Sequence, residues 1–392
     1  MKNNKPKIRF KDFTGPWEQR KVQNVADRFD NLRIPVAANL RVHGTTPYYG
    51  ANGIQDYVDG FTHDGEFVLV AEDGANDLKN YPVKCVNGRI WVNNHAHVLQ
   101  GKAGIADNSF LAFAISQSDI ESLLVGGGRA KLNAETLMSI EFRLPCLQEQ
   151  YQISEYLTLL DNLITLHQRK CDNLKKIKKA MLEKMFPKNG NSVPDVRFKG
   201  FTDDWEQRKL RDKVGIYDGV HQTPKYQDGG IMFLSVENIA TLHSSKYISE
   251  EDFKRDYKVY PQENDILMTR IGDVGTTNVV TDNGLKAYYV SLALLKYRST
   301  NPFFLSNAIQ SDYVQNGLAN RTLKTAIPMK INKDEIGKVD VMLPTSTDEQ
   351  VQIGTYFRNL DNLITLHQRK VENLKKIKRA MLEKMFPKED LI

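Results

Sequence analysis

Basic and amide side chains in loop-like segments are the residues of this chain best suited to a chemical task. Arginine makes paired hydrogen bonds to guanine and asparagine to adenine, so such side chains on loops can recognise base edges. Arg129 and Lys131 lie near a triple glycine, and Arg321 and Lys324 lie at the comparable place of the second half. The other candidates are Arg270, Asn52, Asn93 and Asn94. If Arg321 contacts a base, Arg321→Ala should relax one part of a recognised sequence only.

Two histidines lie two positions apart in the segment Asn93-Asn94-His95-Ala96-His97, which puts both on one face of a strand. A metal site needs a third and a fourth ligand, and the adjacent sequence supplies none, so we predict no metal site. Contact with base edges and hydrogen bonding within a turn both stay open for these side chains.

Motifs for nucleotide-driven or methyl-transfer catalysis are missing from the sequence. The triple glycine is followed by Arg129-Ala130-Lys131, which does not match the phosphate-binding loop of ATPases. The segment Asn301-Pro302-Phe303-Phe304 lacks the second proline of an adenine methyltransferase motif. We interpret it as a helix start comparable to Asn108-Ser109-Phe110-Leu111. We therefore predict no catalytic residues.

Length and composition indicate a folded protein with more than one domain. A chain of 392 residues exceeds what one core usually organises, and 41% hydrophobic with 26% charged residues excludes a largely disordered chain. No apolar run is long enough to span a membrane, so we expect a cytoplasmic protein. Three scattered cysteines, Cys85, Cys146 and Cys171, indicate buried thiols rather than disulfides.

Positive charge is concentrated in two segments. Residues 161–188 and 361–388 each hold eight Lys or Arg against three acidic residues, while the rest of the chain has 38 basic and 42 acidic residues. The run 175–179 and its twin 375–379 fit three interpretations: contact with DNA phosphates, docking on an acidic partner, or a solvated helix face.

An internal repeat explains this duplication. Residues 151–188 match residues 351–388 at 29 of 38 positions, and IRFKDFTGPWEQRKV at 8–22 matches VRFKGFTDDWEQRKL at 196–210 at 10 of 15. Between these repeated ends the two halves share only scattered similarities. The chain is therefore a near-identical frame with two different inserts.

The repeated segment 151–188 has the apolar spacing of a coiled-coil helix, and so does its twin. Ser346 and Glu349 fit a capping box at the start of the second helix. Ile177 and Ile377 are also placed in the seam between the helices. Its central positions are Leu160, Ile164, His167, Leu174, Leu360, Ile364, His367 and Leu374, with the histidines expected to be a packed pair that fixes register.

The predicted fold is mixed α/β with two long helices. Two equivalent seams in one chain pack most simply about a pseudo-two-fold axis, which makes the helices antiparallel and separates the two inserts. Because the inserts differ, two DNA half-sites contacted by them should also differ. Strand-like runs lie at residues 66–70, 89–92, 140–144 and 265–269, a Gly/Asn-rich loop at 48–53, and helical spacing at 110–124 and 303–314.

This arrangement resembles the specificity subunit of type I restriction-modification systems. The resemblance covers almost the whole chain, in the phrases RFK-x-FT-x-x-WEQRK and LDNLITLHQRK and in the insert phrases TPYYGANGI, NNHAHVL and GDILMTRIGDVG. It implies two target recognition domains, at 1–145 and 191–345, and two spacer helices, at 146–190 and 346–392.

The resemblance also implies partners. In that family each recognition domain binds one half of a split site in double-stranded DNA, and the helices set the spacer and bind modification subunits, two in number. Up to two restriction subunits join the complex. The specificity subunit has no active site, and S-adenosylmethionine, ATP and Mg²⁺ are expected on the partners. The alternative from the sequence is a coiled-coil scaffold whose inserts bind proteins.

Overall fold

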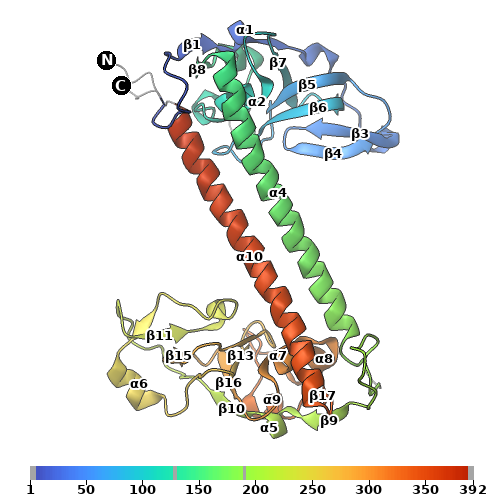
Figure 1. Ribbon diagram of the computed structural model, residues 1–392, viewed down its shortest axis with the longest axis vertical. Helices are drawn as coiled ribbons and strands as arrows, with labels where there is room; N and C mark the ends of the chain where they lie inside the picture. Colours follow the sequence, from blue (N-terminus) through green and yellow to red (C-terminus); the bar gives the residue numbers. More distant parts are fainter. Residues whose placement is uncertain (1–5, 127–129, 189–190, 387–392) are drawn as a thin grey trace. The chain divides into compact units, whose positions relative to one another are not determined.

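The computed structural model describes residues 6–126, 130–188 and 191–386 and divides the chain into two compact units. Unit 1 consists of Met1–His167 and Arg369–Ile392, and unit 2 of Gln168–Gln368. Each unit therefore contains one insert together with parts of both long helices, α4 (Leu147–Lys184) and α10 (Thr347–Met385) (Figure 1). The domain boundaries taken from the sequence repeat stay a prediction.

The two long helices run antiparallel, as the order of their contacts shows. In unit 1 the Lys378 ammonium of α10 lies 2.6 Å from the Asp161 carboxylate of α4. In unit 2 the Lys178 ammonium of α4 lies 2.6 Å from the Asp361 carboxylate of α10. One lysine of each basic run is therefore used between the helices, and the same ion pair forms once in each unit.

The repeated N-terminal phrases close the frame of each unit. The Arg9 guanidinium binds both carboxylate oxygens of Glu149 at the start of α4, at 2.6 and 2.7 Å. Arg197 binds Glu349 at the start of α10 at 2.6 and 2.8 Å. Each phrase also supplies one strand of a two-stranded antiparallel sheet: β1 (Glu18–Lys21) with β8 (Glu141–Leu144), and β9 (Glu206–Lys209) with β17 (Asp340–Leu343).

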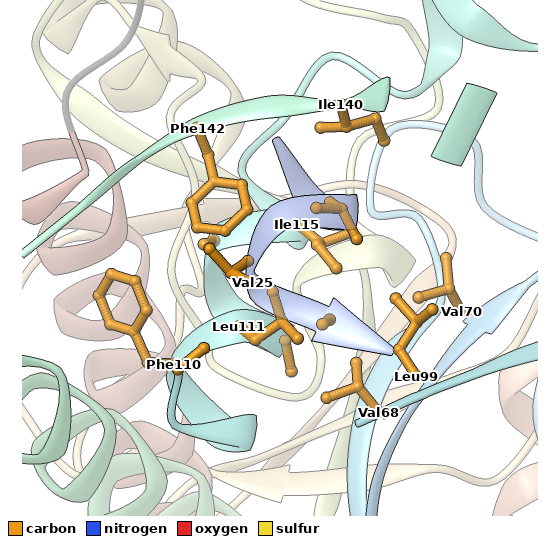
Figure 2. Packing of buried hydrophobic residues seen from close by; sticks show 14 of the residues in the cluster. Val25, Val68, Val70, Leu99, Phe110, Leu111, Ile115, Ile140 and Phe142 are labelled. Atoms are coloured by element: carbon orange, nitrogen blue, oxygen red, sulfur yellow. The ribbon is translucent and has the colours of Figure 1, made fainter. Parts of the chain in front are cut away.

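The insert of unit 1 is built on one six-stranded sheet. Its order is β2 (Ala26–Arg28), β7 (Ala96–Gly101), β5 (His63–Ala71), β6 (Val83–Val92), β3 (His43–Gly50) and β4 (Gly53–Val58). Helix α2 (Asn108–Ser116) packs on this sheet and buries Phe110, Leu111 and Ile115 against Val68 and Leu99 (Figure 2). Two short helices complete the insert, α1 (Val22–Val25) and α3 (Ala134–Ser139).

The insert of unit 2 has two smaller sheets. The first has the order β10 (Gly215–Asp218), β16 (Leu292–Lys296), β13 (Ile266–Thr269) and β14 (Thr277–Val279). The second has the order β12 (Tyr247–Ile248), β11 (Ile231–Leu234) and β15 (Lys286–Tyr288). Helix α7 packs against β14, and the helices are α5 (Leu210–Lys213), α6 (Glu250–Asp256), α7 (Pro302–Gln310), α8 (Asp312–Arg321) and α9 (Lys333–Gly337).

Each frame is completed by side chains from the other half of the sequence. Trp17 of unit 1 packs against Phe386, and Trp205 of unit 2 packs against Phe186, each edge to face. Phe386 and Phe186 are equivalent positions of the repeat, because they are 200 residues apart. The two repeats thus exchange their helix ends to complete the two cores.

The predicted helix start at Asn301 is confirmed. The Asn301 side chain accepts a hydrogen bond from the backbone of Phe304 at 3.0 Å, and Pro302 occupies the first turn of α7. The equivalent cap in unit 1 is Asp107, which accepts from Phe110 at 2.7 Å, so the predicted counterpart began one residue late. The helical spacing at 110–124 predicted a longer helix than the structure has, because α2 ends at Ser116.

Other local predictions were wrong for physical reasons. Tyr48 to Gly50 form the buried end of β3 rather than a loop, because the two aromatic rings pack inside the insert. The Glu349 carboxylate binds Arg197 instead of closing the capping box, although the backbone of Glu349 does donate to Ser346 Oγ at 3.4 Å. Of the three cysteines, Cys146 is exposed and Cys171 is buried.

The seam between the helices also differs from the prediction at one position of each repeat. Ile177 and Ile377 are 44% and 42% exposed, while their neighbours Lys178 and Lys378 turn inward to form the ion pairs with Asp361 and Asp161. A lysine can occupy such a position because its stem packs on apolar surface while its ammonium meets a carboxylate.

Candidate DNA-binding loops

Four candidates of unit 1 lie on segments that meet at one end of the six-stranded sheet. The residues are Asn52 in the β3–β4 turn, Asn93 and Asn94 in the β6–β7 turn, and Lys131 after α2. Loop 72–80, which follows β5, joins these segments. Asn52 donates to a carbonyl of this loop at 2.9 Å, and the backbone of Lys131 forms a bridge to Asp73.

The β6–β7 turn is held to the same loop by its histidine. His95 Nδ1 lies 2.6 Å from a carboxylate oxygen of Asp73, and the backbone of Glu72 donates to the carbonyl of His95 at 2.9 Å. Four segments that are far apart in the sequence therefore form one contiguous set of loops. Loops on a rigid sheet are the usual place for recognition residues.

Equivalent backbone bridges lie in both units. In unit 1 a bridge between Val125 and Lys131 joins the residues on either side of 127–129, which lie outside the described residues. In unit 2 the segment 324–329 is closed by the bridge between Leu323 and Lys330. Both segments come after a helix that packs on the sheet, α2 in unit 1 and α7, followed by α8, in unit 2. In both units a backbone bridge ties the segment to residues just after the equivalent strands β5 and β13. We call the two segments the recognition loops.

The base of the recognition loop in unit 1 is a charged network. The Lys131 ammonium lies 2.8 Å from one Glu72 oxygen, and Arg33 lies 2.7 Å from the other. His97 contacts Asp30 at 2.7 Å through Nδ1 and the carbonyl of the following loop residue, Leu132, at 2.9 Å through Nε2.

The two carboxylates of this network are held in their charged form. Burial opposes ionisation of Asp30, but hydrogen bonds from His97 and from the backbone of Val98 keep the pKa of Asp30 below its ordinary value. Burial also opposes ionisation of Glu72, and the bonds from Lys131 and Arg33 keep the pKa of Glu72 below its ordinary value. Two carboxylates and two basic side chains thus balance each other below the loop.

Asp30, Glu72 and His97 also have the spacing of a metal site, since one ligand atom from each lies within 4.8 Å of the others. The sequence analysis did not group these residues. Arg33 and Lys131 already occupy the Glu72 oxygens, and His97 uses both ring nitrogens in hydrogen bonds. A cation would have to displace these contacts, so the arrangement favours an ion-pair network.

The base of the recognition loop in unit 2 is one ion pair between a buried arginine and a half-buried aspartate. The Arg270 guanidinium binds the Asp218 carboxylate, and its Nε donates to the carbonyl of Ile331 at 3.1 Å. Ile331 in turn donates its backbone N–H to the carbonyl of Arg270 at 3.0 Å. Arg270 is 6% exposed. Its side chain is thus engaged inside the unit, and the structure favours a structural role over the predicted base contact.

The remaining candidates differ in accessibility. Asn93 is 4% exposed and accepts a hydrogen bond from the backbone of His95, so it shapes its own turn. Asn94 and Lys324 are exposed. Arg321 ends α8 and donates to the carbonyl of Gly317 at 3.1 Å, directly before the recognition loop of unit 2. Arg129 lies outside the described residues. Base contact by any of these residues stays a prediction.

The sequence analysis missed one exposed loop, at residues 219–230. It follows Asp218, the last residue of β10. Residues 220–225 line a groove together with Asp252 and Arg255 of α6 and with Tyr257 just after it. His221, Gln222 and Lys225 are exposed on it. Gly219 is required at its start, because a Cβ atom there would lie 2.4 Å from the carbonyl oxygen of Tyr288. The 188-residue offset of the repeat, which pairs Asp30 with Asp218, was a signal for this segment.

The seam positions are buried to different degrees. Leu160 belongs to the buried core of unit 1 and the half-buried Leu374 packs against it; Leu360 and Leu174 have the same relation in unit 2. Ile364 is 9% exposed, Ile164 is half-buried, and His167 and His367 are half-buried with interactions of their own. The packed histidine pair stays a prediction.

Comparison with known proteins identifies the family. The model of the type I restriction modification DNA specificity domain matches residues 15–176 and again residues 202–376. These matches cover well over half of the chain, so the chain belongs to this family of DNA specificity proteins. The two matches also coincide with the two copies of the repeat.

Relatives match over most of their length. A putative type I restriction enzyme specificity subunit, S.HindORF215P of Haemophilus influenzae, is 29% identical over 93% of this chain and 94% of that protein. The MjaVIII specificity subunit of Methanocaldococcus jannaschii is 23% identical over 72% of this chain and 70% of that protein. These relationships give no support to the alternative of a protein-binding scaffold.

The fold is also that of a solved specificity subunit. The crystal structure of a type I restriction-modification S subunit from M. genitalium superposes with a TM-score of 0.76 at 14% identity, covering 98% of this chain and all of that chain. This likeness confirms the predicted mixed α/β fold with two long helices. Within the described residues, no helix is long and apolar enough to cross a membrane.

Proposed function

We propose that this chain is the specificity subunit of a type I restriction-modification complex in which each insert recognises one half of a split, asymmetric DNA site. The observation that carries the proposal is the equivalent placement of the two recognition loops in inserts that share little sequence. One scaffold with two different loops is suited to two different half-sites, because base contacts specify sequence while the framework only positions them.

The long helices offer equivalent surfaces for partner subunits. In unit 1 Leu166 of α4 and Ile377 of α10 are exposed, and in unit 2 the equivalent Leu366 of α10 and Ile177 of α4 are exposed. Exposed apolar side chains at equivalent positions favour two copies of one partner. We infer that these surfaces bind two modification subunits, and that up to two restriction subunits join them.

Catalysis is assigned to the partners in this proposal. The family is that of a DNA specificity domain. The charged residues below each recognition loop form ion pairs with one another, which suits them to hold the loop in place rather than to catalyse a reaction. S-adenosylmethionine, ATP and Mg²⁺ would be bound by the modification and restriction subunits in the cytoplasm. This chain would supply sequence recognition and the spacing between half-sites.

Much of the DNA affinity of the complex would also come from the partners. Outside the two basic helix segments the chain has 38 basic and 42 acidic residues, a poor match for the phosphate backbone. The isolated chain should therefore bind its site more weakly than the assembled methyltransferase at the same salt concentration. Equal affinity would contradict this part of the proposal.

The direct test is to express the chain with its modification subunit in a host that lacks DNA methylation. Single-molecule sequencing should then locate methylated adenines in one asymmetric split motif, and omission of this chain should abolish the motif. The variants Leu166→Asp and Leu366→Asp test the docking surfaces, and Leu285→Asp, at an exposed loop position, is their control. A complex that assembles normally but methylates no motif would contradict DNA recognition.

A further inference from the structure

We propose that Ile327, at the tip of the recognition loop of unit 2, contacts a thymine methyl group in the major groove of the half-site that this unit recognises. The inference rests on the proposed function, since it names a contact within the same loop. Ile327 is 100% exposed, and Met329 beside it is 46% exposed. An isoleucine side chain presented in full to solvent at a loop tip has no role in the core of its own unit.

The ends of the loop carry the charge that DNA requires. Lys324 and Lys330 are both exposed, one at each end of the segment that contains Ile327. Lysines in such positions suit phosphates on either side of a groove, while an apolar tip suits the only apolar group that the major groove presents, the thymine methyl. The combination favours DNA over an apolar protein surface as the occupant.

The loop is also fixed at its base, which makes a specific contact by its tip feasible. The backbone of Gly272 donates to the carbonyl of Met329 at 2.8 Å, and Leu323 donates to Lys330 at 2.8 Å. Below them the buried Arg270 links Ile331 to the half-buried Asp218. A preorganised loop loses little conformational entropy on binding, so a single methyl contact can contribute to specificity.

The corresponding loop of unit 1 has a different composition. Its sequence is Gly126-Gly127-Gly128-Arg129-Ala130, with three glycines and an arginine and no large apolar residue. The proposed thymine contact therefore belongs to unit 2 alone. A change at Ile327 should affect one half of the split site and leave the other half unaffected.

The test uses the full chain in complex with its modification subunit and duplexes that contain the mapped motif. Ile327→Ala should lower methylation of the cognate duplex at least about fourfold, the factor that corresponds to one buried methyl group of ~0.8 kcal/mol. Replacing each thymine of the second half-site by uracil, one at a time, should reproduce this loss at one position. At that position Ile327→Ala should cause no further loss.

Two control variants separate other causes. Leu285→Ala removes another exposed apolar side chain of unit 2 and should leave methylation unchanged. Lys324→Ala should weaken binding on all sequences and reduce the salt dependence by about one phosphate contact. The melting temperature of Ile327→Ala should equal that of the parent chain, because the side chain makes no core contact.

Three results would overturn the inference. Ile327→Ala could leave every duplex unchanged, or it could weaken both half-sites equally. It could also keep its full effect on every uracil duplex, which would indicate a wedge between base steps instead of a methyl contact. Each of these results requires that the parent complex methylates a split motif. A parent complex without any motif would refute the proposed function itself.

Discussion

Asp30 of unit 1 and Asp218 of unit 2 are equivalent residues, 188 positions apart, yet the two units neutralise them differently. Unit 1 surrounds Asp30 with His97 and Arg33, and Arg33 also binds Glu72. Unit 2 uses the single partner Arg270, which stands after β13 where Glu72 stands after β5. The same loop base is therefore maintained by a redundant network in one unit and by one ion pair in the other.

This difference predicts unequal sensitivity to the loss of one basic side chain. In unit 2, removal of the partner leaves the half-buried Asp218 carboxylate without a cation, which is costly. In unit 1, a remaining partner can still neutralise each carboxylate. The two inserts also show that the fold requires a neutralised carboxylate below the recognition loop, and that different basic residues can provide the neutralisation.

Arg270→Met should have the largest effect. It removes the partner of Asp218 and the hydrogen bond to Ile331. Because Asp218 is only half-buried, we expect the free energy of unfolding of unit 2 to fall by about 3 kcal/mol, the lower end of the range for buried ion pairs. Hydrogen exchange of β13 and β16 during urea titration measures this change, with unit 1 as the internal reference. Arg255→Met, at an exposed ion pair of the same unit, is the control and should leave this exchange unchanged.

A stable Arg270→Met variant would contradict the comparison. A second outcome is also informative: the variant should lose discrimination in the half-site of unit 2, because the recognition loop is no longer fixed by Arg270. If a folded variant lost discrimination in both half-sites, Arg270 would instead contribute to the stability of the whole complex.

The charged clusters mark the limit of what the sequence predicts. The repeat predicted the two long helices and the family, because the same phrases occur in both halves. It did not predict that WEQRK forms a frame strand in each unit. Strand runs at 140–144 and 265–269 were also correct to within a residue. In each of the correct cases the signal is local or repeated, and periodicity or self-similarity is enough to find it.

The site required information that no local pattern contains. Asp30, Glu72 and His97 come from three separate strand ends, and only the sheet order brings them together. Arg270 looked like a base-contacting arginine because sequence type does not reveal burial. Ile327 was overlooked for the converse reason: an isoleucine is expected in the core, and its full exposure is a property of the folded loop.

Arg33→Met should have the next largest effect. Arg33 bonds to Glu72 at 2.7 Å and to the carbonyl of Ala96 at 2.9 Å, and it lies 3.5 Å from Asp30. His97 and Lys131 remain as partners, so we expect a loss of about 2 kcal/mol in unit 1. Urea unfolding monitored by exchange of β5 and β7 measures it. A loss as large as that of Arg270→Met would show that the network has no redundancy.

Acid should destabilise unit 1 through the same network. The pKa values of Asp30 and Glu72 are lowered in the folded chain from ordinary values of 3.8 and 4.5. Their stabilisation is therefore complete above the ordinary values and is lost as the pH falls through the folded ones. Exchange of β5 and β7 between pH 6 and pH 3 follows this loss. Asp30→Asn should flatten the pH dependence, whereas Asp64→Asn, at an exposed ion pair, should not.

Lys131→Met should have the smallest effect on stability. It distinguishes two roles of Lys131, contact with a DNA phosphate and fixing of a base-contacting loop. The Lys131 side chain is 46% exposed, and Glu72 keeps Arg33 as a partner, so we expect a change of no more than about 1 kcal/mol. If Lys131 also contacts a phosphate, the variant should bind all sequences more weakly and lose about one unit of salt dependence. A selective loss in the half-site of unit 1 would instead mean that Glu72 and Lys131 fix a base-contacting loop, the role proposed for Asp218 and Arg270 in unit 2.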